Sequence, residues 1–206
     1  MKKLFSTLNK KDSKQQPIVV VSGLPRSGTS MMMRILAEGG MPVVTDELRR
    51  ADSDNPNGYF EFETVRQMSE GNVTWLENAP GKAVKIISAL LEYLPPKYSY
   101  KIIFLERDIQ EVLASQHKML EHRNEKPTAS DAEIELQIQQ HMSAMKPWLV
   151  RQPNMEVMFV NYNTLMKNPE PVCEQISEFI ALPLNQNRML AVPDQHLYRN
   201  RTPPPE

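Results

Sequence analysis

The stretch GLPRSGTS at residues 23–30 brings glycines, an arginine and hydroxyl side chains into one short turn. In a nucleotide-binding P-loop, backbone N–H groups surround the phosphates, a lysine neutralises the outer ones and Ser or Thr holds magnesium. Thr29 stands at the lysine position of such a loop, while Arg26 places a cation inside the turn. The apolar spacing after the turn predicts a helix, whose positive end favours an anion. We therefore predict a phosphate-binding loop suited to an anion shorter than a triphosphate.

A second pair of phosphate-binding side chains lies about 80 residues further along. The stretch FLERDIQEVLASQ places Arg107 at the end of an apolar run and Ser115 eight residues later, on a predicted helix. Arginine offers a forked, permanent charge and serine a neutral donor, and together they suit a phosphate. The alternative is that Arg107 ends a strand and Ser115 hydrogen-bonds within its own helix.

Together the two stretches resemble the sulfotransferases that use 3′-phosphoadenosine 5′-phosphosulfate (PAPS). Their phosphate loop has the form G-x-P-[RK]-S-G-T-[ST], and GLPRSGTS fits it at every fixed place. The resemblance covers residues 17–200 and implies that Arg107 and Ser115 hold the 3′-phosphate, with Tyr162 near the adenine. It implies contacts to the 5′ end of the cofactor from Pro25, Arg26, Ser27, Gly28, Thr29 and Ser30. The basic tail could bring Arg199 or Arg201 to the 3′-phosphate as well.

The chemical step requires cations that spread charge on the transferring group. By resemblance these are Arg26 and Lys85, and no metal is required. Cytosolic members of the family often carry a KTHLP-like stretch, in which a histidine base follows the lysine. In this chain Ile87 occupies the histidine place. The usual base is therefore missing.

We expect a carboxylate base instead, as in carbohydrate-directed and several bacterial sulfotransferases. The stretch NPNGYFEFE resembles a bacterial segment, NPkGyFE, that lies over the active site. Glu61 is the preferred base, with Glu63 second and Glu47 third. A carboxylate needs an environment that tunes its basicity to work near neutral pH, and the neighbouring Tyr59 and Phe60 could supply an apolar one.

The predicted reaction transfers a sulfuryl group from PAPS to a hydroxyl or amine of a small-molecule or sugar acceptor, leaving 3′,5′-ADP. One alternative is a P-loop kinase or NTPase with an altered loop, in which Glu106 or Asp108 would bind magnesium. Another is a module that binds a phosphoadenosine nucleotide without turnover, because the histidine base is absent. The acceptor and the oligomeric state are left open by the sequence.

Strand and helix patterns alternate along the chain and predict the elements that position these residues. Short β-branched or apolar runs predict strands at 17–23, 82–87, 100–106 and 155–162. Apolar residues at helical spacing predict helices at 29–40, 109–123, 130–150 and 169–182. Such alternation predicts a three-layer α/β sandwich of the P-loop NTPase type, with a central parallel sheet of about four to five strands and helices on both faces.

Composition restricts the class of protein further. Its 24 basic and 25 acidic residues nearly cancel, so we expect no nucleic-acid partner. A single cysteine, Cys173, excludes an intramolecular disulfide and a multi-cysteine metal site. Neither a secretory signal nor a membrane-spanning stretch is present, which makes a cytoplasmic location the expectation. We expect a flexible segment at 1–16, one α/β domain at 17–200 and a disordered tail at 201–206.

Overall fold

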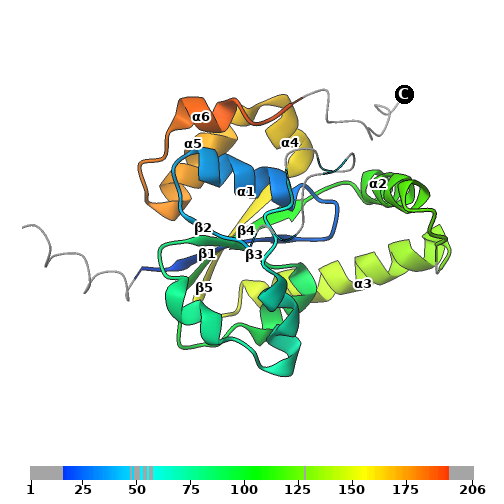
Figure 1. The fold of residues 1–206 in the computed structure, drawn as a ribbon, viewed down its shortest axis with the longest axis horizontal. Coiled ribbons are helices and arrows are strands. Elements are labelled where there is room, and N and C mark those ends of the chain that lie inside the picture. Colours follow the sequence, from blue (N-terminus) through cyan, green and yellow to red (C-terminus); the bar gives the residue numbers. More distant parts are fainter. Residues whose placement is uncertain are drawn as a thin grey trace, which may run out of the picture.

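The computed structural model describes residues 16–46, 48, 52, 55, 58–127 and 129–194 (Figure 1). A five-stranded parallel sheet runs through its centre, in the order β2-β3-β1-β4-β5. The strands are β1 (Ile18–Gly23), β2 (Val43–Val44), β3 (Ala83–Lys85), β4 (Tyr100–Glu106) and β5 (Met155–Asn161). The chain moves from β1 to one side of the sheet and then crosses over to β4 on the other side. Loops after β1 and β4 therefore meet at a topological switch point, where ligands of open α/β sheets bind.

Helices cover both faces of the sheet (Figure 1). One face carries α1 (Thr29–Glu38), α4 (Tyr162–Lys167), α5 (Pro169–Ile180) and α6 (Gln186–Leu190). The opposite face carries α3 (Asp131–Leu149) and the 3-10 helices η1 (Glu63–Glu70), η2 (Thr74–Asn78) and η3 (Ser88–Tyr93). Helix α2 (Ile109–His122) extends from the end of β4 and packs against α3.

The central strand β1 is buried on both faces, which explains its uninterrupted apolar sequence. Side chains alternate across a strand, so Val19 and Val21 pack in the core formed with α1 and α5. Ile18 and Val20 point the other way, into the core beneath the 3-10 helices. The strand is thus held rigidly from both sides, and the loop that follows it starts from a fixed point.

These elements confirm the predicted fold class, and the four predicted strands and four predicted helices are present within two residues at each end. Sequence patterns missed β2, the 3-10 helices, α4 and α6, because elements of this length show too few periods to be recognised. No helix within the described residues is long and apolar enough to cross a membrane. Apart from Gln16, the two predicted tail segments lie outside the described residues, as do Arg199 and Arg201.

Candidate functional site

The loop between β1 and α1 ends at Gly28, which is the N-cap of α1 and has a left-handed backbone with φ of 100°. Neither a capping side chain nor an acidic residue occupies the first turn of this ten-residue helix. An added Cβ at Gly28 would lie 2.4 Å from Cδ2 of Tyr162, so a side chain fits there only if the Tyr162 ring moves. The N-terminal end of α1 therefore keeps the positive potential that attracts an anion. This arrangement fits the phosphosulfate end of the predicted cofactor.

Two other loop residues take different positions. Pro25 is exposed at the tip of the loop, whereas Ser27 is buried with only 1% of its surface exposed. Ser27 Oγ lies beside Gly23, at 2.6 Å from the position a Cβ would take there. The absence of a side chain at Gly23, the last residue of β1, thus leaves space for the Ser27 side chain inside the loop.

The two stretches predicted to bind phosphate are in direct contact. Arg26 Nε donates a hydrogen bond to Ser115 Oγ at 3.0 Å, across 89 positions of sequence. Arg107 Nη1 donates to the backbone oxygen of Arg26 at 3.1 Å. Arg26 has a φ of 70°, an uncommon conformation for a residue other than glycine, and these two bonds help to hold it. The sequence prediction placed Arg26 at the sulfuryl group, whereas its guanidinium here reaches the serine of the second pair.

Arg107 itself is held from several sides. Its Nε donates to Oε2 of Glu111 at 2.9 Å, and its guanidinium carbon lies 4.3 Å from the centre of the Tyr162 ring. The second oxygen of Glu111 accepts from Nδ2 of Asn163 at 2.9 Å. Burial raises the pKa of Tyr162, so the ring remains an uncharged surface against which Arg107 stacks. Neither Glu111 nor Asn163 was predicted from the sequence. The four-residue spacing of Arg107 and Glu111 could have indicated Glu111 as an ion-pair partner, whereas no pattern indicated Asn163.

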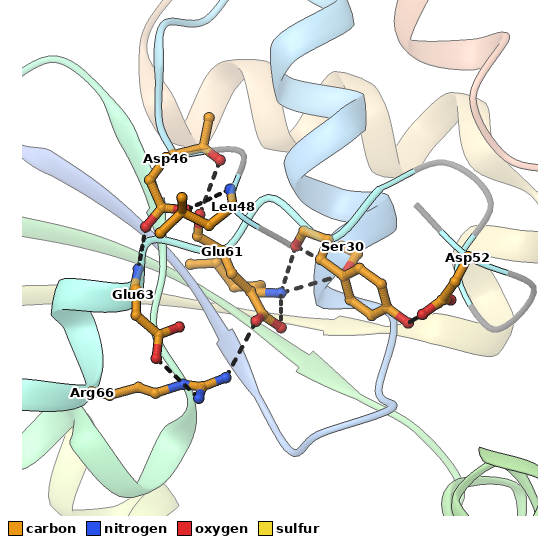
Figure 2. Close-up of polar contacts among 10 residues, drawn as sticks. Ser30, Asp46, Leu48, Asp52, Glu61, Glu63 and Arg66 are labelled. Atoms are coloured by element: carbon orange, nitrogen blue, oxygen red, sulfur yellow. Dashed lines mark hydrogen bonds and ion pairs between the residues drawn. The ribbon is translucent and has the colours of Figure 1, made fainter. Parts of the chain in front are cut away.

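A second cluster joins Lys85, Ser30 and Glu61 (Figure 2). Lys85 Nζ donates to the backbone oxygen of Tyr59 at 2.6 Å and lies 3.3 Å from Oε1 of Glu61. Ser30 Oγ donates to the same backbone oxygen at 3.2 Å and accepts from Lys85 Nζ at 3.5 Å. The last residue of β3, the first turn of α1 and the segment before η1 therefore meet at one point.

Glu61 lies between two cations. Its Oε2 is 3.6 Å from Nη2 of Arg66, while Nη1 of Arg66 is 3.1 Å from Oε1 of Glu63 (Figure 2). Lys85 is nearly buried, with 9% of its side chain exposed, whereas Arg66 is 66% exposed. The Thr45 hydroxyl donates to the backbone oxygen of Glu61 at 3.0 Å and fixes this segment.

The other two candidate bases are placed differently. Glu63 is about half exposed on the first turn of η1, where it pairs with Arg66. Glu47 lies outside the described residues. Of the two candidate carboxylates within the described residues, Glu61 is the one for which a contact with Lys85 is found.

The carboxylates of the kinase alternative are engaged in other contacts. Glu106 pairs with Lys146 of α3, and Asp108 is the N-cap of α2, accepting from the backbone N–H groups of Gln110 and Glu111. Within the described residues no group of three or more His, Cys, Asp or Glu side chains could hold a metal ion.

Comparison with known families decides the identity. The sulfotransferase domain profile matches residues 16–200 of the chain. The protein belongs to the sulfotransferase family. Sulfuryl transfer from PAPS is thus the reaction of this enzyme. No curated protein sequence matches this sulfotransferase.

Several solved sulfotransferases share the fold at low sequence identity. Sulfotransferase STF9 from Mycobacterium avium is 16% identical, with 86% of this chain and 68% of that chain covered and a TM-score of 0.54. The mouse sulfotransferase SULT7A1 complexed with PAP is 15% identical over 90% of this chain and 68% of that chain, with a TM-score of 0.56. The sulfotransferase domain from the curacin biosynthetic pathway is 14% identical over 94% of both chains, with a TM-score of 0.51.

Proposed function

We propose that this sulfotransferase acts on a hydroxyl or amine of a small-molecule or sugar acceptor, with Glu61 as the base. The observation that supports this proposal is a line of two separate polar clusters along the carboxyl edge of the sheet. Glu61, Lys85 and Ser30 form one end of the line. Arg26, Ser115 and Arg107 form the other end, on the far side of the same loop. One nucleotide with phosphate groups at both ends would lie along this edge.

Each end of the line has a separate role in holding the donor. Arg107 and Ser115 would hold the 3′-phosphate, because both contact the same loop residue: Ser115 accepts from Arg26 Nε, and Arg107 donates to the Arg26 backbone oxygen. The uncapped first turn of α1, with Ser30, would hold the 5′ end. Tyr162, whose ring lies against Gly28 and Arg107, would support the nucleotide between the two ends. PAPS supplies the sulfuryl group and a stable leaving nucleotide.

At the acceptor, Glu61 would take the proton through its carboxylate as the hydroxyl attacks in line. Lys85 lies next to that carboxylate and its charge would stabilise the transferring group. The cytoplasmic location expected from the composition stays a prediction.

The proposal is tested first by nucleotide selectivity. Thermal-shift titrations would compare 3′,5′-ADP, ATP, and ATP with magnesium. A site of micromolar affinity should gain about 4 kcal/mol at a millimolar concentration of 3′,5′-ADP without metal. If only ATP with magnesium stabilises the protein, the kinase alternative is correct and this proposal is wrong.

The base is tested by Glu61→Gln, with transfer from labelled PAPS measured over a panel of alcohols, amines and sugars. We expect sulfuryl transfer to be lost while affinity for 3′,5′-ADP changes less than about twofold, because Glu61 contacts Lys85 rather than Arg107 or Ser115, the proposed 3′-phosphate ligands. Glu63→Gln is the matched control, since Glu63 shares Arg66 with Glu61. Full activity of the Glu61 variant, or an equal loss in the control, would move the role elsewhere. A wild-type protein that binds 3′,5′-ADP and transfers to no acceptor would support the non-catalytic module.

A further inference from the structure

Glu111 is a buried carboxylate that none of the steps above uses. Its side chain is only 1% exposed, on the first turn of α2, and it pairs with Arg107, which is 7% exposed. One oxygen accepts from Arg107 Nε and the other from Asn163 Nδ2, each at 2.9 Å. A buried charge of this kind is costly unless both of its partners are present. Both partners are present here.

Among the described residues, Glu111, Arg26 and Tyr162 each help to fix the orientation of the Arg107 guanidinium. Glu111 holds Nε, the backbone oxygen of Arg26 holds Nη1, and the Tyr162 ring lies against the flat face at 4.3 Å. A guanidinium recognises phosphate through its planar fork, so its orientation decides whether it can make paired hydrogen bonds. Glu111 in turn is held by Asn163 of α4, which follows the far strand β5.

We propose that Glu111 is a positioning residue, which orients Arg107 and thereby gives the enzyme its selectivity for nucleotides with a 3′-phosphate. The inference rests on the proposed role of Arg107 in the 3′-phosphate site. The ligand class concerned is a nucleoside 3′,5′-bisphosphate, as opposed to a nucleoside 5′-monophosphate. Glu111 touches neither the acceptor nor the sulfuryl group in this scheme.

The direction in which removal of the Glu111 charge changes affinity for the 3′-phosphate distinguishes a positioning role from simple charge repulsion. A carboxylate near a phosphate site repels the phosphate, so removal of its charge alone would strengthen binding. In Glu111→Gln, however, a single acceptor oxygen replaces two, and the new NH₂ group faces either Arg107 Nε or Asn163 Nδ2, both of which donate. The guanidinium would then lose its fixed orientation, and binding of the 3′-phosphate would weaken.

The experiment measures dissociation constants of 3′,5′-ADP and 5′-AMP by calorimetry for the full chain. For Glu111→Gln we expect affinity for 3′,5′-ADP to fall about tenfold, while affinity for 5′-AMP changes less than about twofold. Glu111→Asp keeps the charge and should recover part of the preference, and Asn163→Ala should lose part of it by releasing Glu111. Glu156→Gln is the matched control, because Glu156 pairs with a lysine at the exposed edge of β5 and should leave both constants unchanged.

The possible outcomes are distinct. If wild type does not prefer 3′,5′-ADP to 5′-AMP, the proposed role of Arg107 fails. If wild type shows the preference and folded Glu111→Gln keeps or increases it, Glu111 is not a positioning residue. Circular dichroism checks folding, and if Glu111→Gln does not fold, the Glu111→Asp and Asn163→Ala variants decide. An equal loss of both nucleotides in these variants indicates a structural role and overturns the inference.

Discussion

The contact between Gly28 and Tyr162 makes a sharp prediction for Gly28→Ala. Gly28 has a φ of 100°, and an added Cβ would lie 2.4 Å from Tyr162 Cδ2. Gly40 is the matched control, because its φ of 97° is nearly the same and an added Cβ there meets nothing within 4 Å. Both substitutions therefore place alanine at a positive φ, and only Gly28→Ala adds the clash with the ring.

The magnitude follows from these two components. A left-handed alanine costs about 1–2 kcal/mol in either position. Gly28→Ala must in addition move the Tyr162 ring and weaken its stacking with Arg107, at about 0.5–2 kcal/mol. We expect a total destabilisation of about 1.5–4 kcal/mol for Gly28→Ala and about 1–2 kcal/mol for Gly40→Ala. Only Gly28→Ala should also weaken binding of 3′,5′-ADP, since it alone disturbs Tyr162 and Arg107.

Denaturant unfolding followed by circular dichroism gives the free energies, and calorimetry gives the affinity. In a Tyr162→Ala background the ring is absent, so the excess cost of Gly28→Ala over Gly40→Ala should disappear. Equal costs of the two glycine substitutions in the wild-type background would refute the reasoning, because the clash would then have no energetic consequence. An excess that persists without the ring would refute it equally.

Two further predictions concern single side chains. Lys85→Met should reduce kcat/KM with a working acceptor by about 10²–10³, because Lys85 is the cation beside Glu61. The control is Lys101→Met, which removes a lysine that is paired with Glu156. A loss below tenfold in Lys85→Met would contradict the proposed role of Lys85. Burial raises the pKa of Cys173 to about 11, so its thiol should not react with Ellman's reagent at pH 8 until the protein is unfolded. Rapid reaction of the native protein would show that solvent reaches Cys173 and would contradict this prediction.

Much of the fold was readable from local patterns. The apolar run of β4 was predicted with its observed bounds, Tyr100–Glu106, because a strand buried on both faces needs apolar residues without interruption. The loop after β1 was predicted from its glycines and arginine, and Gly23 and Gly28 have φ values of 143° and 100°, which favour glycine. β2 has only two residues, so no periodicity could reveal it.

What the sequence by itself determined was which segments form strands and helices and which residues could bind phosphate, because both depend on neighbours close along the chain. Only the tertiary structure decided that Arg26 reaches Ser115, 89 residues away, and that Asn163 reaches Glu111, 52 residues away. It also brought the backbone oxygen of Tyr59 to Lys85. Every residue type has such an oxygen, so the identity of residue 59 does not indicate this contact. Such contacts arise from the crossover connections of the sheet, which bring distant loops to one edge and are not encoded in any short stretch.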